Sequence, residues 1–138
     1  MSYLIDTNVL SELRKRKPDA NVVAWVQERP RQSLHLSVLS LGEIRKGVED
    51  VQDAAFRQAL TDWLENDLPT YFVGRLLDID APVADRWGRV QASAGRDLPV
   101  IDGLLAATAL QHDLTLVTRN VKDFAGLGVP LIDPWQIP

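Results

Sequence analysis

Three carboxylates and one amide adjoin apolar stretches that lie far apart in the sequence: Asp6, Glu43, Asp102 and Asn120. Carboxylates that come close raise one another's pKa and destabilise a fold, unless a cation cancels their repulsion. Mg²⁺ and Mn²⁺ prefer oxygen ligands of this kind. Such a cation lowers the pKa of bound water and polarises a phosphoryl oxygen. If the fold brings the four residues together, the sequence predicts a site for metal-dependent hydrolysis.

Each carboxylate also has a purely structural explanation. Asp6 can cap the helix that follows it, because its side chain can accept the unpaired N–H groups of the first turn. Glu43 can lie in solvent on a helix and pair with Lys46. Asp102 can also be a cap, although its apolar neighbours favour burial and an unpaired buried carboxylate is costly. For each residue alone both explanations stay open, and the combination favours the metal site.

Alternating strands and helices are expected to position these residues. The expected strands are 3–5, 34–38, 75–79, 114–118 and 129–132, and the expected helices are 7–17, a segment capped by Asp19 or Asn21 that ends before Pro30, 40–48, 53–68, 82–94 and a segment that opens at Leu98–Asp102 and runs to about His112. The 53–68 helix is expected to place Phe56, Leu60, Trp63 and Leu64 on one face. The alternation predicts an α/β protein with a central, mostly parallel sheet flanked by helices. Ligands of such sheets bind beyond the carboxyl ends of the strands.

The composition limits the class of protein. The chain has 138 residues, 46% of them hydrophobic and 25% charged, which predicts a single domain with a real core. The net charge of −4 argues against a protein that coats nucleic acid through bulk charge. The absence of cysteine excludes disulfides and thiolate metal sites and makes the cytoplasm the expected location. Neither a signal peptide nor a membrane-spanning run is expected.

Four stretches carry a family resemblance: LIDTNVLSEL, LSVLSLGEIRKGV, VIDGLLAATALQHDLTLVTRN and FAGLGVPLIDPW. In this order and at these separations, they resemble a PIN-domain ribonuclease, and more narrowly the VapC-type toxins of bacterial toxin–antitoxin pairs. The resemblance extends from residue 4 to residue 135. It implies that residues 1–138 form one PIN domain and that the protein is a Mg²⁺- or Mn²⁺-dependent endoribonuclease.

The resemblance also implies roles for the four residues. Asp6 and Asp102 would hold the metal, and Glu43 would bind a second metal or its water shell and orient the attacking water. The family's fourth acidic position is occupied by Asn120, which with Thr118 behind it would position water or phosphate. This departure leaves the number of metal ions open, and the nearby Asp123 is a weaker candidate for the missing carboxylate. Cleavage would leave a 5′-phosphate and a 3′-hydroxyl.

Partners are implied in the same way. VapC-type toxins are typically homodimers that a cognate VapB-like antitoxin neutralises in a hetero-oligomer, with a segment of the antitoxin in the acidic site. RNA, such as tRNA, would be the substrate. The basic run Arg14–Lys17 is expected to end the first helix, either in solvent or against RNA phosphates. Further phosphate-contact candidates are Arg45, Lys46, Arg119 and Lys122.

Rival functions make different demands on the sequence. A receiver domain needs an aspartate at the end of a middle strand, and Leu39-Ser40 follow the second strand instead. A dinucleotide enzyme needs G-x-G-x-x-G after the first strand, which is missing. Ribonuclease chemistry with paired histidines would have to use His35 and His112, both of which are expected to be structural. A catalytically weak PIN-like binding module remains an alternative because of Asn120.

Overall fold

A computed structural model gives the fold, and the structure describes residues 1–136. The elements in chain order are β1 (Tyr3–Ile5), α1 (Thr7–Leu13), α2 (Ala20–Gln27), the 3₁₀ turn η1 (Arg31–Ser33), β2 (Leu34–Ser37), α3 (Val38–Glu49), α4 (Ala54–Asp62), the π-helical segment η2 (Trp63–Asp67), α5 (Leu68–Tyr71), β3 (Leu76–Leu77), α6 (Ala81–Ser93), α7 (Val100–Gln111), β4 (Thr115–Val117), the 3₁₀ turn η3 (Val121–Phe124) and β5 (Leu131–Ile132).

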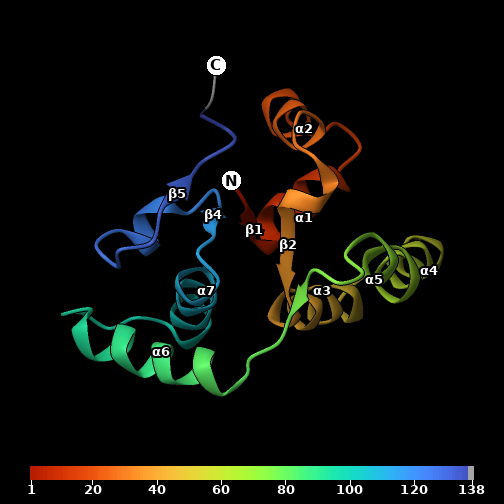
Figure 1. Cartoon of the computed structure of the whole chain (residues 1–138). Coiled ribbons are helices and arrows are strands. Elements are labelled where there is room, and N and C mark those ends of the chain that lie inside the picture. The colour runs from red at the N-terminus through yellow and green to blue at the C-terminus, as the bar shows by residue number, and fades with distance from the viewer. Residues whose placement is uncertain (137–138) are drawn as a thin grey trace.

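The five strands form one sheet in the order β3-β2-β1-β4-β5, and every described pairing is parallel. β1 lies at the centre, where Tyr3 is opposite Leu34 on one side and Thr115 on the other. The predicted α/β fold with a parallel central sheet is therefore confirmed. Because all strands run the same way, residues that follow β1 and β4 meet at one edge of the sheet (Figure 1).

Alternate strand residues serve two separate cores, as the pleat of a strand requires. Tyr3 and Ile5 join the first core, against α1 to α5, whereas Leu4 joins the second, with residues of α6 and α7. In Figure 1, α3, α4 and α5 lie to the right of β1, whereas α6 and α7 lie to its left. Within residues 1–136, no helix is long and apolar enough to cross a bilayer.

The first helix is shorter than the sequence predicts. It ends at Leu13 instead of Lys17, so the basic run lies in the connection to α2 and does not end the helix. The cause is Glu12, which is 5% exposed: its carboxylate accepts the Asp19 N–H at 2.9 Å and pairs with Lys15 at 2.8 Å. These contacts turn the chain toward α2, which Asp19 caps.

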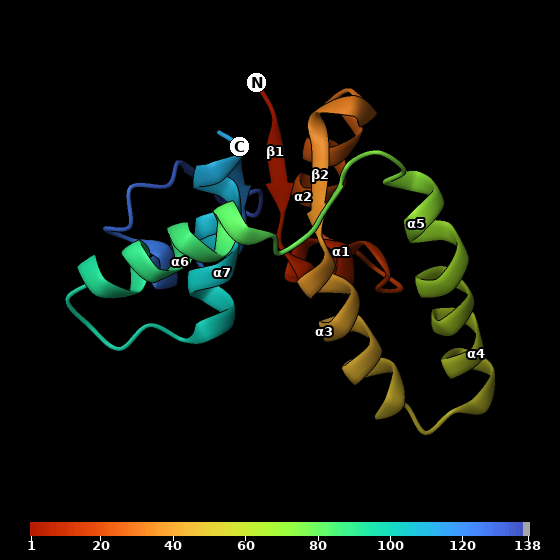
Figure 2. The ribbon, with the colours of Figure 1, turned by 60° about the horizontal axis from the view of Figure 1, so that its bottom comes forward.

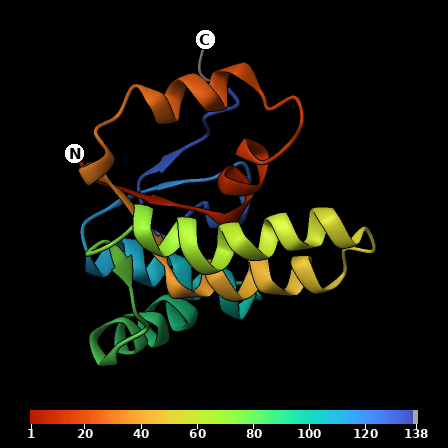
Figure 3. The same cartoon turned by 90° about the vertical axis from the view of Figure 1, so that its right-hand side faces the viewer.

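The helix predicted over 53–68 is longer and less regular than expected. α4, η2 and α5 form one rod from Ala54 to Tyr71 that packs beside α3 as a long hairpin (Figures 2 and 3). The π-helical segment was not predicted. Leu64 is buried, whereas Phe56, near the start of the rod, is 48% exposed and lines the same surface hollow as Leu60 and Trp63.

Several other predicted boundaries also shift by a few residues. Val38 begins α3 instead of ending β2, because the Ser37 side chain accepts the Leu39 N–H and caps the helix. The outer strands β3 and β5 have two residues each, fewer than predicted. Ile101, in the first turn of α7, is 37% exposed.

Candidate active site

Asp6 leaves β1 at the centre of the sheet edge and is almost completely buried, at 8% exposure. Its backbone N–H still donates to Val117 of β4 at 2.9 Å. One carboxylate oxygen, Oδ1, accepts the Thr7 N–H at 2.7 Å and caps α1. The other, Oδ2, accepts the Thr118 hydroxyl at 2.8 Å. The capping explanation for Asp6 is thus correct. Both carboxylate oxygens of Asp6 still lie at the carboxyl ends of the strands, where a site would form.

Glu43 comes to the same edge from α3. The Thr7 hydroxyl donates to Glu43 Oε1 at 2.7 Å and lies 2.8 Å from the hydroxyl of buried Ser40. Thr7 therefore links the residue after Asp6 to α3 through its side chain. The partner of Glu43 is this hydroxyl, on the site side of the helix, rather than Lys46.

Asp102 lies in the first turn of α7 and is half-buried. It does not cap that helix, because the N-cap position is Pro99 and no side chain makes the capping bond. The capping explanation for Asp102 is therefore wrong. Its neighbours Gly103 and Leu105 are buried, so the helix is fixed against the core while the carboxylate faces the edge.

Asn120 follows β4, and Thr118 holds it there. The Thr118 hydroxyl oxygen accepts hydrogen bonds from the Asn120 N–H at 3.0 Å and from the Asn8 side-chain amide at 3.3 Å. The same hydroxyl donates its own hydrogen bond to Asp6. Asn8 in turn accepts the Arg119 N–H at 3.3 Å. One completely buried threonine thus joins the residues after β1 to those after β4.

These residues share one cleft of about 410 Å³. Its lining consists of Asp6, Thr7, Asn8, Ser11, Glu43, Ile101, Asp102, Leu105 and Asn120. The four residues singled out in the sequence therefore come together at the carboxyl edge of the sheet. Ser40 was not predicted as part of the site, and the contact of Thr7 and Ser40 with Glu43 depends on the packing of α3 against α1.

The negative charges in the cleft repel one another, and burial together with this repulsion raises the pKa of Asp6 and of Asp102. Burial raises the pKa of Asp6 to about 6, and the charges of Glu43 and Asp102 add to this shift, whereas the bonds from Thr118 and Thr7 lower it. The pKa of Asp102 is raised first by burial, then by the charge of Asp123, then by that of Glu43. Asp123, in η3, is the neighbouring charge with the largest effect on Asp102. From the sequence, Asp123 is only the weaker candidate for the missing carboxylate. Three residues make one turn of a 3₁₀ helix, so Asp123 lies on the same side of the turn as Asn120.

The side-chain oxygens that line the cleft are the kind of ligand that a hard divalent cation prefers. All the polar side chains that face the cleft offer oxygen, and an oxygen that accepts one hydrogen bond has a further lone pair for a metal. Within residues 1–136, no three His, Cys, Asp or Glu side chains are yet close enough together to hold a metal ion.

Basic side chains near the cleft are partly engaged by the protein. Arg14 lies over the Trp63 ring at 5.1 Å, and Lys15 pairs with Glu12. Arg119, next to Asn120, lies over the Trp135 ring at 5.0 Å. The two histidines are elsewhere: His35 and His112 line a separate hollow with Met1 and Ser2, at the amino edge of the sheet.

Comparisons with known proteins agree with this architecture. The family model "PIN domain" matches residues 3–128. The chain is 35% identical to Toxin FitB of Neisseria gonorrhoeae, with 96% of this chain and 98% of that protein covered. It is 32% identical to VapC ribonuclease Y4jK of Sinorhizobium fredii, with coverage of 96% and 97%. This chain is a PIN-domain protein of the VapC type.

The structural likeness extends over the whole PIN domain. The crystal structure of FitAcB from Neisseria gonorrhoeae superposes with a TM-score of 0.91 at 33% identity, and the match covers 98% of this chain and 99% of that chain. The strands and helices that carry the acidic residues are therefore part of the fold that this chain has in common with that structure.

Proposed function

We propose that this protein is the endoribonuclease toxin of a VapBC-type toxin–antitoxin pair and hydrolyses RNA phosphodiester bonds with the help of Mg²⁺ or Mn²⁺. The observation that carries the proposal is the single cleft that Asp6, Glu43, Asp102 and Asn120 share. The names of the relatives support the ribonuclease class. A cytoplasmic location and a single PIN domain over the chain belong to the same proposal, and residues 137 and 138 lie outside the described part.

The chain's own residues would prepare the site. Thr118 and the Thr7 N–H hold the Asp6 carboxylate, and the Thr7 hydroxyl holds Glu43, so both acids are oriented before substrate arrives. Asp6 and Asp102 would bind the cation, and Glu43 would orient water. A bound divalent cation would polarise the phosphoryl oxygen and lower the pKa of water.

Asn120 and Asp123 would together take the role of the family's fourth acidic residue. Asn120 offers an amide that can donate to a phosphate oxygen or accept from water. Asp123 supplies a negative charge close enough to raise the pKa of Asp102. We propose that Asn120 contacts substrate or water while Asp123 provides the outer charge, which leaves one strongly bound cation at Asp6 and Asp102.

The antitoxin and a second copy of the chain are the proposed partners. An apolar groove lies between α1, α2 and the α4–α5 rod, with Leu10, Leu13, Val26 and Tyr71 in its walls. A neighbouring hollow shares Arg14 and Trp63 with this groove and shares Thr7 and Glu43 with the acidic cleft. An antitoxin segment with apolar side chains and a terminal arginine would fit this path. Val100 and Ile101, 56% and 37% exposed, would lie in the homodimer contact.

The function can be tested with purified protein freed from antitoxin. A mixed tRNA pool is incubated with wild type, Asp6→Asn and the exposed control Asp78→Asn, each in Mg²⁺, Mn²⁺ and EDTA. We expect cleavage by wild type and Asp78→Asn in either metal, with none in EDTA and none by Asp6→Asn. Metal-independent cleavage, or full activity of Asp6→Asn, would contradict the proposal.

A second candidate function is a binding module with little catalysis, and Asn120 is the observation in its favour. It predicts that the folded protein binds RNA but leaves a broad pool of RNAs uncut in every metal. Mn²⁺ titration of the same sample then decides between an inert module and a nuclease of narrow substrate range. The nuclease binds Mn²⁺ at the cleft and loses this binding in Asp6→Asn.

A further inference from the structure

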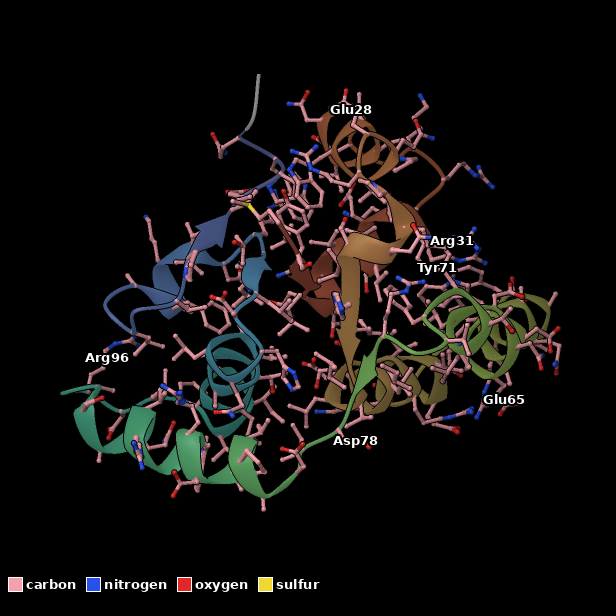
Figure 4. All side chains as sticks on the ribbon, viewed as in Figure 1. Glu28, Arg31, Glu65, Tyr71, Asp78 and Arg96 are labelled. Atoms are coloured by element: carbon pink, nitrogen blue, oxygen red, sulfur yellow. The ribbon has the colours of Figure 1, made fainter. Side chains whose placement is uncertain are left out.

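Arg96 connects two parts of the chain that each bring residues to the acidic cleft. It lies in the connection between α6 and α7, after Gly95, whose φ is +69°. Its guanidinium Nη2 donates to the carbonyl oxygen of Asp123 at 2.8 Å and to that of Ala125 at 3.2 Å. Figure 4 shows Arg96 beyond the end of α6, facing the loop that precedes β5.

The two carbonyls belong to the end of η3. Asp123 is in this turn and Ala125 is its C-cap, so their oxygens stand where a short helix leaves acceptors unsatisfied. A guanidinium is suited to such a place, because it is always charged and presents several N–H donors in a rigid plane. Arg96 thereby fixes the backbone of the turn that follows Asn120 and carries Asp123.

The other end of the connection is fixed to α7. The Gln91 side-chain amide, from α6, donates to the Leu98 carbonyl at 3.1 Å. Pro99 then caps α7, and its carbonyl accepts the Gly103 N–H at 3.0 Å. Gly103 packs so tightly on α6 that a Cβ there would collide with the Gln91 side chain. The segment that holds Arg96 is therefore anchored three residues before Asp102.

We propose that Arg96 is a positioning residue of the acidic site, which sets the separation between Asp102 on α7 and the Asn120–Asp123 turn. This inference rests on the proposed metal-dependent function. Arg96 acts through carbonyls of the turn and contacts neither substrate nor metal. Phe124 packs η3 into the same core as α7, and the two hydrogen bonds of Arg96 add a polar link between the connection before α7 and the end of this turn.

Two other roles for Arg96 predict different results. The charge of Arg96 also lowers the pKa of Asp102. If Arg96 acted only through its charge, its removal would relieve repulsion of a bound cation and strengthen Mn²⁺ binding at a pH where Asp102 is fully ionised. If it contacted an RNA phosphate, its removal would raise KM and reduce the salt dependence of RNA binding, with Mn²⁺ affinity unchanged. A positioning role predicts weaker Mn²⁺ binding and a lower kcat at nearly constant KM.

The test uses Arg96→Gln and Arg96→Lys in the full chain, with Arg89→Gln as matched control. Arg89 is exposed and pairs with Asp85 on the surface of α6, so its replacement removes the same charge without touching the turn. Mn²⁺ affinity is measured by isothermal titration, kcat and KM with a cleavable RNA, and folding by thermal unfolding. The Lys variant keeps the charge but loses the planar donor group.

We expect both Arg96 variants to bind Mn²⁺ about tenfold more weakly and to lose kcat by a similar factor, while Arg89→Gln matches wild type. Tighter Mn²⁺ binding by Arg96→Gln with wild-type behaviour of Arg96→Lys would overturn the proposal in favour of charge. A rise in KM alone would overturn it in favour of phosphate contact. A fall in melting temperature with unchanged Mn²⁺ affinity would reduce Arg96 to a fold-stabilising residue. If wild type itself neither binds Mn²⁺ nor cuts RNA, the proposed function fails instead.

Discussion

The two halves of the acidic cleft are built differently. In the inner half, Asp6 and Glu43 have their side-chain oxygens held directly, by Thr118, by the Thr7 N–H and by the Thr7 hydroxyl. In the outer half, Asn120 and, beside the cleft, Asp123 are held through their backbones, by Thr118 and Arg96. Asp6 is buried, whereas Glu43, Asn120 and Asp123 are exposed, so the inner half differs from the outer half in one buried carboxylate and in the direct bonds to its side-chain oxygens.

This difference indicates a division of work. A carboxylate that is oriented and desolvated before a cation arrives binds it without further ordering, which favours affinity. Exposed groups on a turn can change their distance from the cation and accommodate substrate. We infer that the inner half determines whether metal binds, and that the outer half adjusts how strongly it binds and where the RNA phosphate lies.

The largest effect is expected from the inner half. Asp6→Asn should lower cleavage by about 10³-fold or more and yet stabilise the metal-free fold at pH 8. The folded-state pKa of about 6 exceeds the ordinary 3.8, so ionised Asp6 destabilises the fold increasingly as pH rises from 4 to 6, and fully above that. A shift of this size corresponds to about 3 kcal/mol. Denaturant unfolding of both proteins at pH 4 and pH 8 measures it. The amide nitrogen introduced by Asp6→Asn cannot accept from Thr7 or Thr118, so the variant loses one bond at both pH values, but its stability relative to wild type should still rise from pH 4 to pH 8. A difference that does not change with pH would contradict the burial of a charged Asp6.

Thr118→Val should have the next largest effect, because Thr118 serves both halves. It removes the bond that lowers the Asp6 pKa and the acceptor of the Asn120 N–H, so we expect a 10- to 100-fold loss of kcat. The free energy of unfolding should fall by about 1–3 kcal/mol, since buried partners are left unsatisfied. Thr118→Ser keeps the hydroxyl and should retain most activity. Equal losses in the Val and Ser variants would show that the hydroxyl bonds are unimportant.

The pH dependence of Mn²⁺ binding is a milder test. A cation needs ionised Asp6, whose pKa is raised to about 6, so the affinity should be constant above pH 7 and fall about tenfold by pH 5. The raised pKa of Asp102 acts in the same direction. Isothermal titration at several pH values measures this, and a constant affinity down to pH 5 would place the metal away from Asp6.

The smallest effect is expected from the outer half. Asn120→Asp adds a carboxylate beside Asp102 and should tighten Mn²⁺ binding by only a few-fold. In the double variant with Asp6→Asn, it should restore neither metal binding nor cleavage. If the double variant did recover activity, the two halves would be interchangeable and the proposed division would be wrong.

The sequence predicted the parallel sheet and the four residues of the cleft, because strand ends and helix starts follow from local apolar patterns. It did not predict contacts that depend on how distant elements pack. The bond from Thr7 to Glu43 needs α3 beside α1, and the link from Arg96 to Asp123 needs two loops side by side. The end of α1 at Leu13 was also not predicted, because it depends on buried Glu12, whose carboxylate accepts the N–H of Asp19, seven residues later.

In the proposed mechanism, a divalent cation binds at the carboxyl end of β1, between Asp6 and Asp102. Anomalous diffraction from crystals grown with Mn²⁺ locates such a cation. We expect a peak at about 2.1 Å from a carboxylate oxygen of each of these two residues. A peak only in the hollow with His35 and His112, or no peak in the acidic cleft at saturating Mn²⁺, would contradict it.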